Sequence, residues 1–451
     1  MRLGALLLMG LLTQAARAAP ADTTIARQAR TLLERAVRPN GPGVAVLVAR
    51  GDRVLYRAAH GLASVELGVT LAPAQVFRLG SITKTFTAAA VLQLAAVGQL
   101  RLEDPLNRFL PAYPGGAAIT LRQLLSHTAG ISDGWEASPT DEFTTAQLVA
   151  LIARQPLDFA PGTAYRYSNS GYILLGAVLE AATRQPWPRA LRERLLAPLG
   201  LTHTGYYPTA QVVPGRVAGY SQDSTGATTC APYAGGSGPG AAGALSSTVD
   251  DVRAFLWALT HGQLLPPPLY QAMSTPQATA DGQPTAYGYG LMFGTVRGVP
   301  VVEHNGGIEG FATHFTYFPQ QDVTVIVLAN TDAGAPNPRS LAHRLGALAI
   351  GQPYAELREE PLPPARLASL AGTYRVGPDS YRTVFVRDQR LYTRRDQGAP
   401  RRLKVATGDV LCFENDETDL FRVVRDRRGR VVALDYWADG LSATRREQRR
   451  P

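Results

Sequence analysis

The sequence contains 451 residues, of which 45% are hydrophobic and 18% are charged. This composition excludes a disordered chain and predicts a globular protein of two or three domains. The net charge is +9, and much of the basic excess lies near the C-terminus, in stretches such as 425–430 and 445–450. A basic face can bind nucleic acid or another anionic polymer. A solvated, arginine-rich surface is the simpler interpretation, and we expect no nucleic-acid partner.

Residues 1–18 have the features of a secretory signal peptide. Arg2 precedes an apolar stretch at 3–12 that is too short to span a bilayer, and Ala16-Arg17-Ala18 fits a small-x-small cleavage site. No later stretch is long enough to be a membrane-spanning helix. We therefore expect an exported, periplasmic or extracellular protein without an integral membrane segment in the mature chain.

The elements before residue 260 are one hairpin and a series of helices. Gly51-Asp52 marks the hairpin turn between two short β-type runs. Apolar residues recur every three to four positions in the helical segments. We expect strands over 44–48 and 54–58, and helices over 23–37, 85–97, 121–125, 145–153, 172–182 and 248–259.

The pattern changes to strands after residue 280. We expect strands over 288–293, 301–303, 312–318 and 323–329, followed by a helix over 340–350. Because strands come first and last, both ends of this region should pair in one antiparallel sheet with a helical insert between them. The expected fold class is therefore α+β, with a main domain over 19–351.

A proline-containing linker over 352–365 separates this domain from the rest of the chain. Beyond it, apolar residues alternate with a period of two, which predicts a small all-β barrel or sandwich over 366–451. The only cysteines are Cys230 and Cys412, so the chain is not a disulfide scaffold. Either one disulfide or two buried thiols would fit the sequence.

The stretch Ser81-Ile82-Thr83-Lys84 is a candidate for nucleophilic catalysis. Only two of the 45 lysine and arginine residues are lysines, Lys84 and Lys404. Lysine can lose its proton when it is partly buried, whereas arginine in a protein effectively cannot. A serine and a lysine three residues apart at a helix start share one face, where a neutral amine could activate the hydroxyl.

Two further triplets could complete such a site. In Tyr167-Ser168-Asn169, a tyrosine could move a proton and an amide could bind both the lysine and a substrate carbonyl. In His304-Asn305-Gly306, glycine would allow a substrate to lie against a strand edge. The following amide, of Gly307, would be a second oxyanion donor beside that of Ser81. Each triplet alone is a weak signal.

Taken in order, these segments resemble the class C β-lactamase-related serine hydrolases, which include DD-peptidases, D-aminopeptidases and esterases. The resemblance covers about residues 23–350 and rests on FRLGSITKTFTA, LLSHTAGI, PGTAYRYSNSGY, LGLTHTGY, AGALSSTVDDVRAF and EHNGGIEGF. It implies that Ser81 is the nucleophile, that Lys84 is the base and that Tyr167 shares the base role. It also implies substrate contacts at Asn169, His304, Gly306 and Gly307.

One position departs from the true class C β-lactamases, which have Lys-Thr-Gly where this chain has His304-Asn305-Gly306. That lysine meets the substrate carboxylate. A histidine would be largely neutral at pH 7 unless its pKa is raised, so efficient β-lactam hydrolysis is not expected. Some DD-peptidases and D-aminopeptidases of the family do have histidine there, and the C-terminal domain resembles the small barrels of members that are not β-lactamases.

Competing motifs lack the context that they require. Gly130-Ile131-Ser132-Asp133-Gly134 fits GxSxG, but a nucleophile elbow needs a preceding strand and a following helix, so we expect Ser132 to be uninvolved. His127 is expected to be a structural cap. The seven histidines are scattered and no HExxH is present, which implies no metal site. No cofactor is expected.

The sequence therefore predicts an exported serine hydrolase that forms an acyl-enzyme on an ester, an amide or a D-amino peptide. Its partners would be small molecules or short peptides, with peptidoglycan fragments among the candidates. The alternatives are a non-catalytic penicillin- or cell-wall-peptide-binding protein, a true β-lactamase, and a protein whose basic C-terminal domain binds an anionic polymer.

Overall fold

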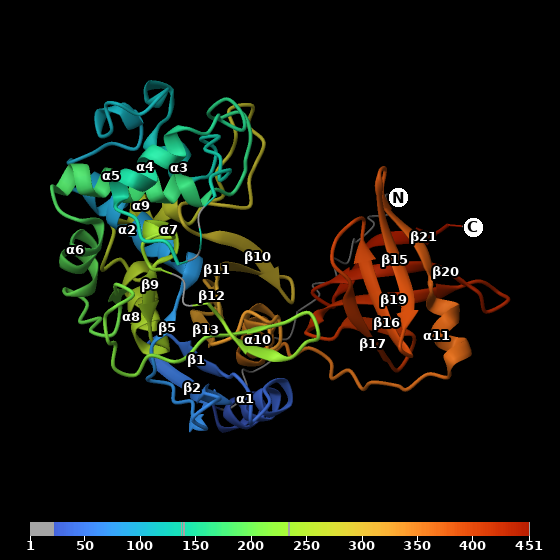
Figure 1. The fold of residues 1–451 in the computed structure, drawn as a ribbon. Coiled ribbons are helices and arrows are strands. Elements are labelled where there is room, and N and C mark those ends of the chain that lie inside the picture. Colours follow the sequence, from blue (N-terminus) through green and yellow to red (C-terminus); the bar gives the residue numbers. More distant parts are fainter. Residues whose placement is uncertain (1–21, 137, 139, 233–234, 451) are drawn as a thin grey trace, which may run out of the picture.

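A six-stranded antiparallel sheet, in the order β10-β11-β12-β13-β1-β2, forms the centre of the larger of two domains (Figure 1). The computed structural model describes residues 22–136, 138, 140–232 and 235–450, so the predicted signal peptide lies outside the described residues. Strands from both ends of this domain pair side by side, as Val46 with Val327 shows. The expected antiparallel sheet is thus confirmed. Its strands are β1 (Val44–Arg50), β2 (Arg53–His60), β10 (Met292–Val296), β11 (Val299–Ile308), β12 (Phe311–Phe318) and β13 (Val323–Ala329).

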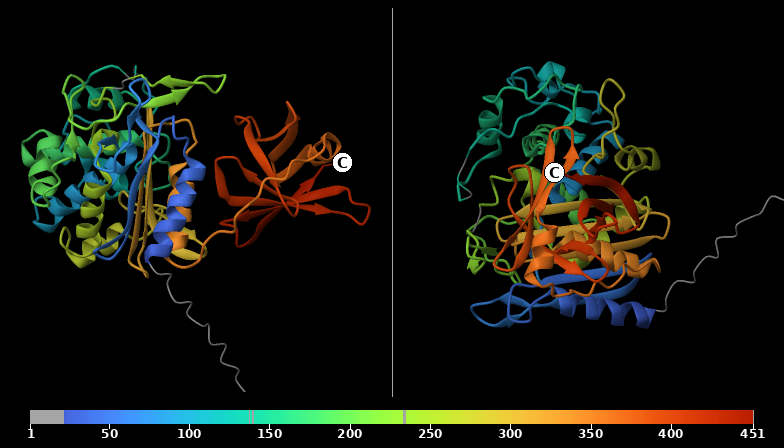
Figure 2. Two further views of the ribbon diagram at one scale, coloured as in Figure 1. Left: turned by 90° about the horizontal axis from the view of Figure 1, so that it is seen from below. Right: turned by 90° about the vertical axis from the view of Figure 1, so that its right-hand side faces the viewer.

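Helices cover both faces of this sheet, as the edge-on view on the left of Figure 2 shows. On one face α1 (Asp22–Ala36) and α10 (Pro338–Ala349) pack against the strands, and on the other face α8 (Val249–Thr260) lies against β1 and β13. Successive side chains of a strand point to opposite faces, so β1 contributes to two cores. Leu47 belongs to the core of the helical insert, whereas Val46 packs with α1 and α10.

The helical insert lies between β2 and β10 in the chain. Its central helix, α2 (Thr83–Ala96), is buried along most of its length, which agrees with the alanine-rich apolar stretch in the sequence. The other helices are α3 (Leu121–Leu125), α4 (Thr145–Ala153), α5 (Asn169–Thr183), α6 (Trp187–Leu191), α7 (Gly240–Gly243) and α9 (Pro267–Met273). The short strands are β3 (Leu62–Ser64), β4 (Val69–Thr70), β5 (Phe77–Arg78), β6 (Gly205–Tyr206), β7 (Tyr220–Gln222), β8 (Thr228–Cys230) and β9 (Leu245–Ser247).

Two expected strands of the sheet differ from their observed bounds by more than two residues at one or both ends. The strand expected over 288–293 begins only at Met292, because Gly290 has a positive φ of 68° that breaks the extended backbone. The strand expected over 301–303 is longer and extends over Val299–Ile308, because its polar and glycine residues pair along their whole length with β12. The extension matters because it places the His304 triplet inside the sheet.

The C-terminal domain is a closed barrel of eight antiparallel strands. Of the two expected architectures, the barrel is therefore confirmed and the sandwich is excluded. Its core contains Leu411, Phe421 and Leu434, and α11 (Pro364–Leu370) packs against it. The strands are β14 (Gly372–Gly377), β15 (Ser380–Arg387), β16 (Arg390–Arg395), β17 (Arg401–Ala406), β18 (Val410–Phe413), β19 (Asp416–Arg425), β20 (Val431–Ala438) and β21 (Ser442–Arg449).

Both cysteines are free thiols: Cys230 is exposed and Cys412 is buried in the barrel. The cysteines are therefore unpaired, and the alternative of two buried thiols holds only for Cys412. Among the described helices, none has an apolar stretch of the length needed to cross a membrane.

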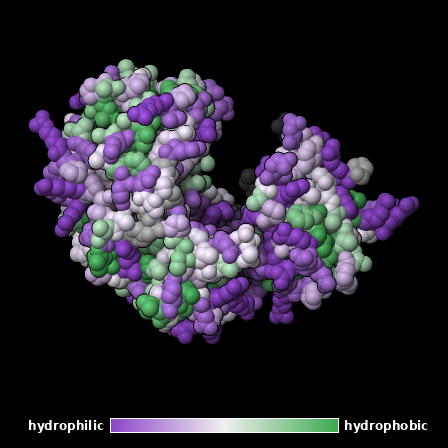
Figure 3. Space-filling model, viewed as in Figure 1, coloured by the Kyte–Doolittle hydropathy of each residue, from purple (hydrophilic) through white to green (hydrophobic). Residues whose placement is uncertain are grey.

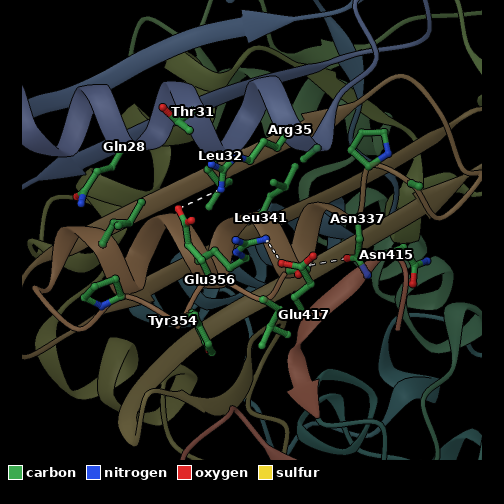
Figure 4. A pocket seen from close by; sticks show the side chains of 18 of the residues that line it. Gln28, Thr31, Leu32, Arg35, Asn337, Leu341, Tyr354, Glu356, Asn415 and Glu417 are labelled. Atoms are coloured by element: carbon green, nitrogen blue, oxygen red, sulfur yellow. Dashed lines mark hydrogen bonds and ion pairs between the residues drawn. The ribbon is translucent and has the colours of Figure 1, made fainter. Parts of the chain in front are cut away.

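The contacts between the two domains are mainly polar. Arg344 of α10 donates to Glu417 of β19 at 2.9 Å, and Asn415 donates to the carbonyl of Gly334 at 2.7 Å. A cavity of about 560 Å³ lies between α1, α10 and the barrel, where Arg35 pairs with Glu356 across it (Figure 4). Figure 3 shows that hydrophilic residues border the groove between the domains.

We predict that the two domains fold independently. The apolar core of the barrel contains no residue of the sheet domain. Among the described residues beyond Gly351, Tyr354 of the linker packs against a core of the sheet domain, so removing the linker and barrel breaks mainly polar contacts. A chain ending at Gly351 should be soluble and helical by circular dichroism, with Ser81 still reactive toward a labelled penicillin or fluorophosphonate. An insoluble product would contradict this prediction.

Candidate active site

Ser81 lies in a single turn of 3-10 helix, Gly80–Ile82, immediately before α2. The chain enters this turn through Gly80, whose φ is 55°. A Cβ atom at Gly80 would lie 2.7 Å from the amide nitrogen of Gly307, so both the backbone conformation and the space require glycine. This turn places Ser81, and the positive end of the helix, beside strand β11.

Lys84 lies one helical turn after Ser81, and its side chain is completely buried. Its Nζ atom is 3.0 Å from Ser81 Oγ, 2.8 Å from Asn169 Oδ1 and 2.9 Å from the carbonyl oxygen of Ala242. Burial lowers the pKa of Lys84 to about 7, and the carboxylate of Asp133 opposes this shift. The amine is therefore neutral in a large fraction of molecules near neutral pH.

The partners of Lys84 determine how the neutral amine is oriented. A neutral amine has two N–H groups and one lone pair. The oxygens of Asn169 and Ala242 can only accept hydrogen bonds, so both N–H groups point toward them. The lone pair then faces Ser81 Oγ, which is the arrangement that removal of the serine proton requires.

Tyr167 is hydrogen-bonded to Ser81, and its ring centroid is 4.8 Å from Lys84 Nζ. Burial raises the pKa of Tyr167 well above its usual value, and the hydrogen bond with Ser81 only partly offsets this effect. The phenol is therefore protonated at neutral pH. It can donate a proton, whereas the neighbouring amine is the better acceptor.

Asp133, from a preceding loop, holds the segment that contains Tyr167 and Asn169. Asp133 accepts hydrogen bonds from Ser168 Oγ at 3.0 Å and from the amides of Asn169 and Ser170, both at 2.8 Å. These bonds satisfy amides at the start of α5. Asp133 of the GxSxG stretch therefore helps to cap the N-terminus of α5.

The side chains of His127 and Ser132 each accept a hydrogen bond from a backbone amide. His127 is buried and its Nδ1 atom accepts the N–H of Ser168 at 3.1 Å, so the expected capping role is confirmed. Ser132 Oγ accepts the amide of Gly134 at 3.2 Å. No histidine or lysine is bonded to Ser132 among the described residues.

His304 is fully buried, and both of its ring nitrogens are hydrogen-bonded within the protein. Its Nδ1–H donates to the carbonyl of Asn305 at 2.7 Å, and its Nε2 accepts the hydroxyl of Tyr287 at 2.9 Å. Burial, aided by the nearby Lys84, lowers the pKa of His304 to about 3. The residue is neutral and offers no unpaired N–H group to a ligand.

Gly306 and Gly307 lie where β11 passes the start of α2. A Cβ atom at Gly306 would lie 1.9 Å from the carbonyl oxygen of Leu79, and Thr313 of β12 donates to the same oxygen at 2.7 Å. A Cβ atom at Gly307 would meet nothing within 4 Å. The strand is thus held against the Ser81 turn, while Gly307 borders open space that a substrate can enter.

The structure places all seven predicted site residues around this turn: Ser81, Lys84, Tyr167, Asn169, His304, Gly306 and Gly307. Sequence reasoning missed Asp133, Ala242 and Tyr287. Ala242 begins one of the stretches that resemble family motifs, so that stretch was a usable signal, whereas Asp133 lies in the GxSxG stretch that the sequence analysis set aside. Nothing in the sequence around Tyr287 indicates its contact with His304.

Comparisons with known proteins agree with this geometry. A family model described as Beta-lactamase matches residues 25–349. Penicillin-binding protein 4* of Bacillus subtilis (strain 168) is 26% identical over 375 residues, which cover 77% of this chain and 82% of that protein.

Two solved structures are also similar. A D-stereospecific amidohydrolase from Streptomyces sp. is 31% identical with a TM-score of 0.60, covering 68% of this chain and 94% of that chain. The structure of SurE is 28% identical with a TM-score of 0.62, and covers 95% of this chain and 100% of that one. The resemblance found in the sequence is confirmed, and the chain belongs to the Beta-lactamase family, among its class C β-lactamase-related serine hydrolases.

Proposed function

We propose that this protein is an exported serine hydrolase that forms an acyl-enzyme at Ser81 on an ester, an amide or a D-amino peptide. The observation that supports this most strongly is the 3.0 Å contact between Ser81 Oγ and the buried amine of Lys84. That amine has a pKa of about 7 and its lone pair faces the hydroxyl. These are the two properties that a general base for serine needs near neutral pH.

In the proposed reaction, Ser81 Oγ attacks the substrate carbonyl carbon while Lys84 takes the hydroxyl proton. The amides of Ser81 and Gly307 stabilise the negative oxygen of the tetrahedral intermediate. Tyr167 donates its proton to the leaving alcohol or amine and regains one from Lys84. Water then attacks the acyl-enzyme by the same steps in reverse order, which releases the acid and restores Ser81.

The surroundings of His304 favour substrates without a carboxylate at that position. Both ring nitrogens are already bonded, to Asn305 and Tyr287, so the side chain provides neither a charge nor a free donor. Esters, amides and D-amino peptides that carry no carboxylate at that position fit this environment better than β-lactams. The similarity to a D-stereospecific amidohydrolase supports the same choice.

A substrate panel tests the proposal. The purified chain is assayed with p-nitrophenyl esters, D- and L-amino acid amides, D-Ala-D-Ala peptides and nitrocefin, with Ser81→Ala as the blank. Turnover of an ester or D-amino substrate that the blank lacks supports the proposal. Covalent labelling of Ser81 without turnover of any compound would favour the penicillin-binding alternative.

We further predict that nitrocefin is a poor substrate and that His304→Lys improves it. A positive charge near the bound carboxylate should lower the barrier by about 1–3 kcal/mol in a partly desolvated pocket. The measurement is kcat/KM for nitrocefin relative to a neutral ester. His304→Gln is the matched control, because it changes the ring without adding charge. Efficient nitrocefin hydrolysis by the wild type would contradict this reading of His304.

The proposal places the protein in the periplasm or outside the cell. Determining the N-terminus of protein recovered outside the cytoplasm tests it, with cleavage expected after Ala18. The polymer-binding alternative receives less support, because several barrel arginines are paired with acids, for example Arg425 with Asp409 and Arg446 with Asp435. Steep salt dependence of retention on a polyanion would revive that alternative.

A further inference from the structure

A second cluster of ionisable side chains lies on the other face of β11, behind the Ser81 site. Glu303 precedes His304 in the strand, so its side chain points to the opposite face. Its Oε2 atom is 2.7 Å from His343 Nε2, 3.2 Å from His314 Nε2 and 3.3 Å from Thr316 Oγ1. All four side chains are buried.

Three separate elements bring these groups together. Glu303 belongs to β11 and is paired in register with Thr316 of β12, while His314 lies two residues earlier on the same face of that strand. His343 comes from α10, which packs over β12. The cluster is thus built by the fold from residues that are distant in the sequence, and it is separate from the Lys84 contacts.

The carboxylate of Glu303 is buried without a fixed positive partner. Within the described ranges its ion pairs are with His314 and His343 alone. A neutral imidazole donates a hydrogen bond but provides no charge. Burying a carboxylate is costly unless an opposite charge or a metal ion compensates it.

We propose that Glu303, His314 and His343 form a binding site for Zn²⁺. Their ligand atoms all lie within 4.8 Å of one another. Zinc bonds of about 2.0–2.1 Å in tetrahedral geometry require ligand separations of roughly 3.3 Å, which small side-chain shifts would reach. Two imidazole nitrogens and one carboxylate oxygen match zinc, whereas calcium and magnesium prefer oxygen ligands alone.

Zinc binding would change the other contacts of His314. Its Nε2 atom is 3.1 Å from Thr316 Oγ1. For Nε2 to bind zinc, the imidazole proton must move to Nδ1. His314 Nδ1 is buried and has no hydrogen-bond partner among the described residues, so the moved proton would lack an acceptor and zinc binding would have to offset that cost.

The proposed ion has a structural role. It would tie α10 to β11 and β12, and β11 also contains His304, Gly306 and Gly307. Because the cluster is buried behind the sheet, the ion has no open position toward Ser81. Covalent labelling of Ser81 therefore does not depend on this site, and either proposal can fail without the other.

Metal analysis of the full chain tests the proposal. The protein is treated with a chelator, dialysed, and titrated with Zn²⁺ or Co²⁺. We expect one zinc per chain by elemental analysis, a rise in thermal midpoint with zinc, and the visible absorption of four-coordinate Co²⁺. A wild type that gives neither stoichiometric binding nor this spectrum overturns the proposal.

Variants locate the bound ion. Glu303→Gln, His314→Gln and His343→Gln should each weaken zinc binding by more than about 100-fold, since each removes a direct ligand and loss of an outer partner alone costs 10–100-fold. His203→Gln, at an exposed histidine, should bind like the wild type. Unchanged zinc content in the three site variants would assign the ion to another location and overturn the proposal.

Discussion

Ser81→Ala is expected to abolish covalent labelling and to lower the rate of hydrolysis by about 10⁴-fold or more. The reason is geometric. The hydroxyl is held 3.0 Å from the amine of Lys84, next to the Gly307 amide, and alanine leaves no nucleophile there. The measurement is intact mass after incubation with a fluorophosphonate or a labelled penicillin, together with kcat/KM on an ester.

Ser132→Ala is the matched control for this prediction. It removes the serine of the GxSxG stretch, whose hydroxyl accepts the amide of Gly134 as its one hydrogen bond among the described residues. Labelling and turnover should stay close to those of the wild type. Peptide mapping that finds the label on Ser132 or Ser168 would refute the assignment of Ser81.

The parts of the fold that could be predicted are those with strong periodicity. The spacing of apolar residues placed α3, α4 and β13 at their observed bounds, and Thr248 accepts the N3 amide of α8 as expected for an N-cap. The antiparallel sheet followed from the order of the elements, and the all-β C-terminal domain followed from the period-two alternation of apolar residues. Such signals are local, which is why the sequence shows them directly.

Elements without a periodic signal were missed. The helices α6, α9 and α11 are short and each has proline in its first turn. Tertiary packing decides whether so few residues form a helix. The last strand, β21, is rich in arginine, and its pairing with β14 and β20 is visible only once the barrel closes.

The candidate active site also has residues that the sequence showed and contacts that it did not show. Ser81, Lys84 and Tyr167 were found through motifs, but the acceptor of the third Lys84 contact is the backbone of Ala242, 158 residues away. The contact between Tyr287 and His304 depends on how the loop before β10 packs against the sheet. The cluster of Glu303, His314 and His343 spans 40 residues, so scattered histidines in the sequence did not indicate it.

Lys84→Arg is expected to be nearly as inactive as Lys84→Ala. Arginine stays protonated, so it cannot take the proton of Ser81. Its planar fork also does not fit a buried space in which Ser81, Asn169 and Ala242 surround a single nitrogen at 2.8–3.0 Å. The substitution keeps the charge of the protonated lysine, so retained activity would show that this charge alone is sufficient.

The amine of Lys84 also determines how kcat/KM depends on pH. The pKa of Lys84 is lowered to about 7, and the base is active only when neutral, so kcat/KM should rise with pH through this region and level off above it. Tyr167 and Lys84 share a hydrogen-bonded site, so this rising limb of the pH profile reports the two groups as a coupled pair. Lys84→Arg should lack this limb.

Lys404→Arg is the matched control, since it changes the only other lysine of the chain. Lys404 is partly exposed and its Nζ atom lies 3.6 Å from Glu417 Oε1, an ion pair that arginine can also form. Its activity should equal that of the wild type.

The decisive measurement is kcat/KM of both arginine variants on one ester. If Lys84→Arg kept more than about a tenth of wild-type activity, a cost below ~1.4 kcal/mol, the lysine would act only through its charge. Proton transfer would then belong to Tyr167 alone.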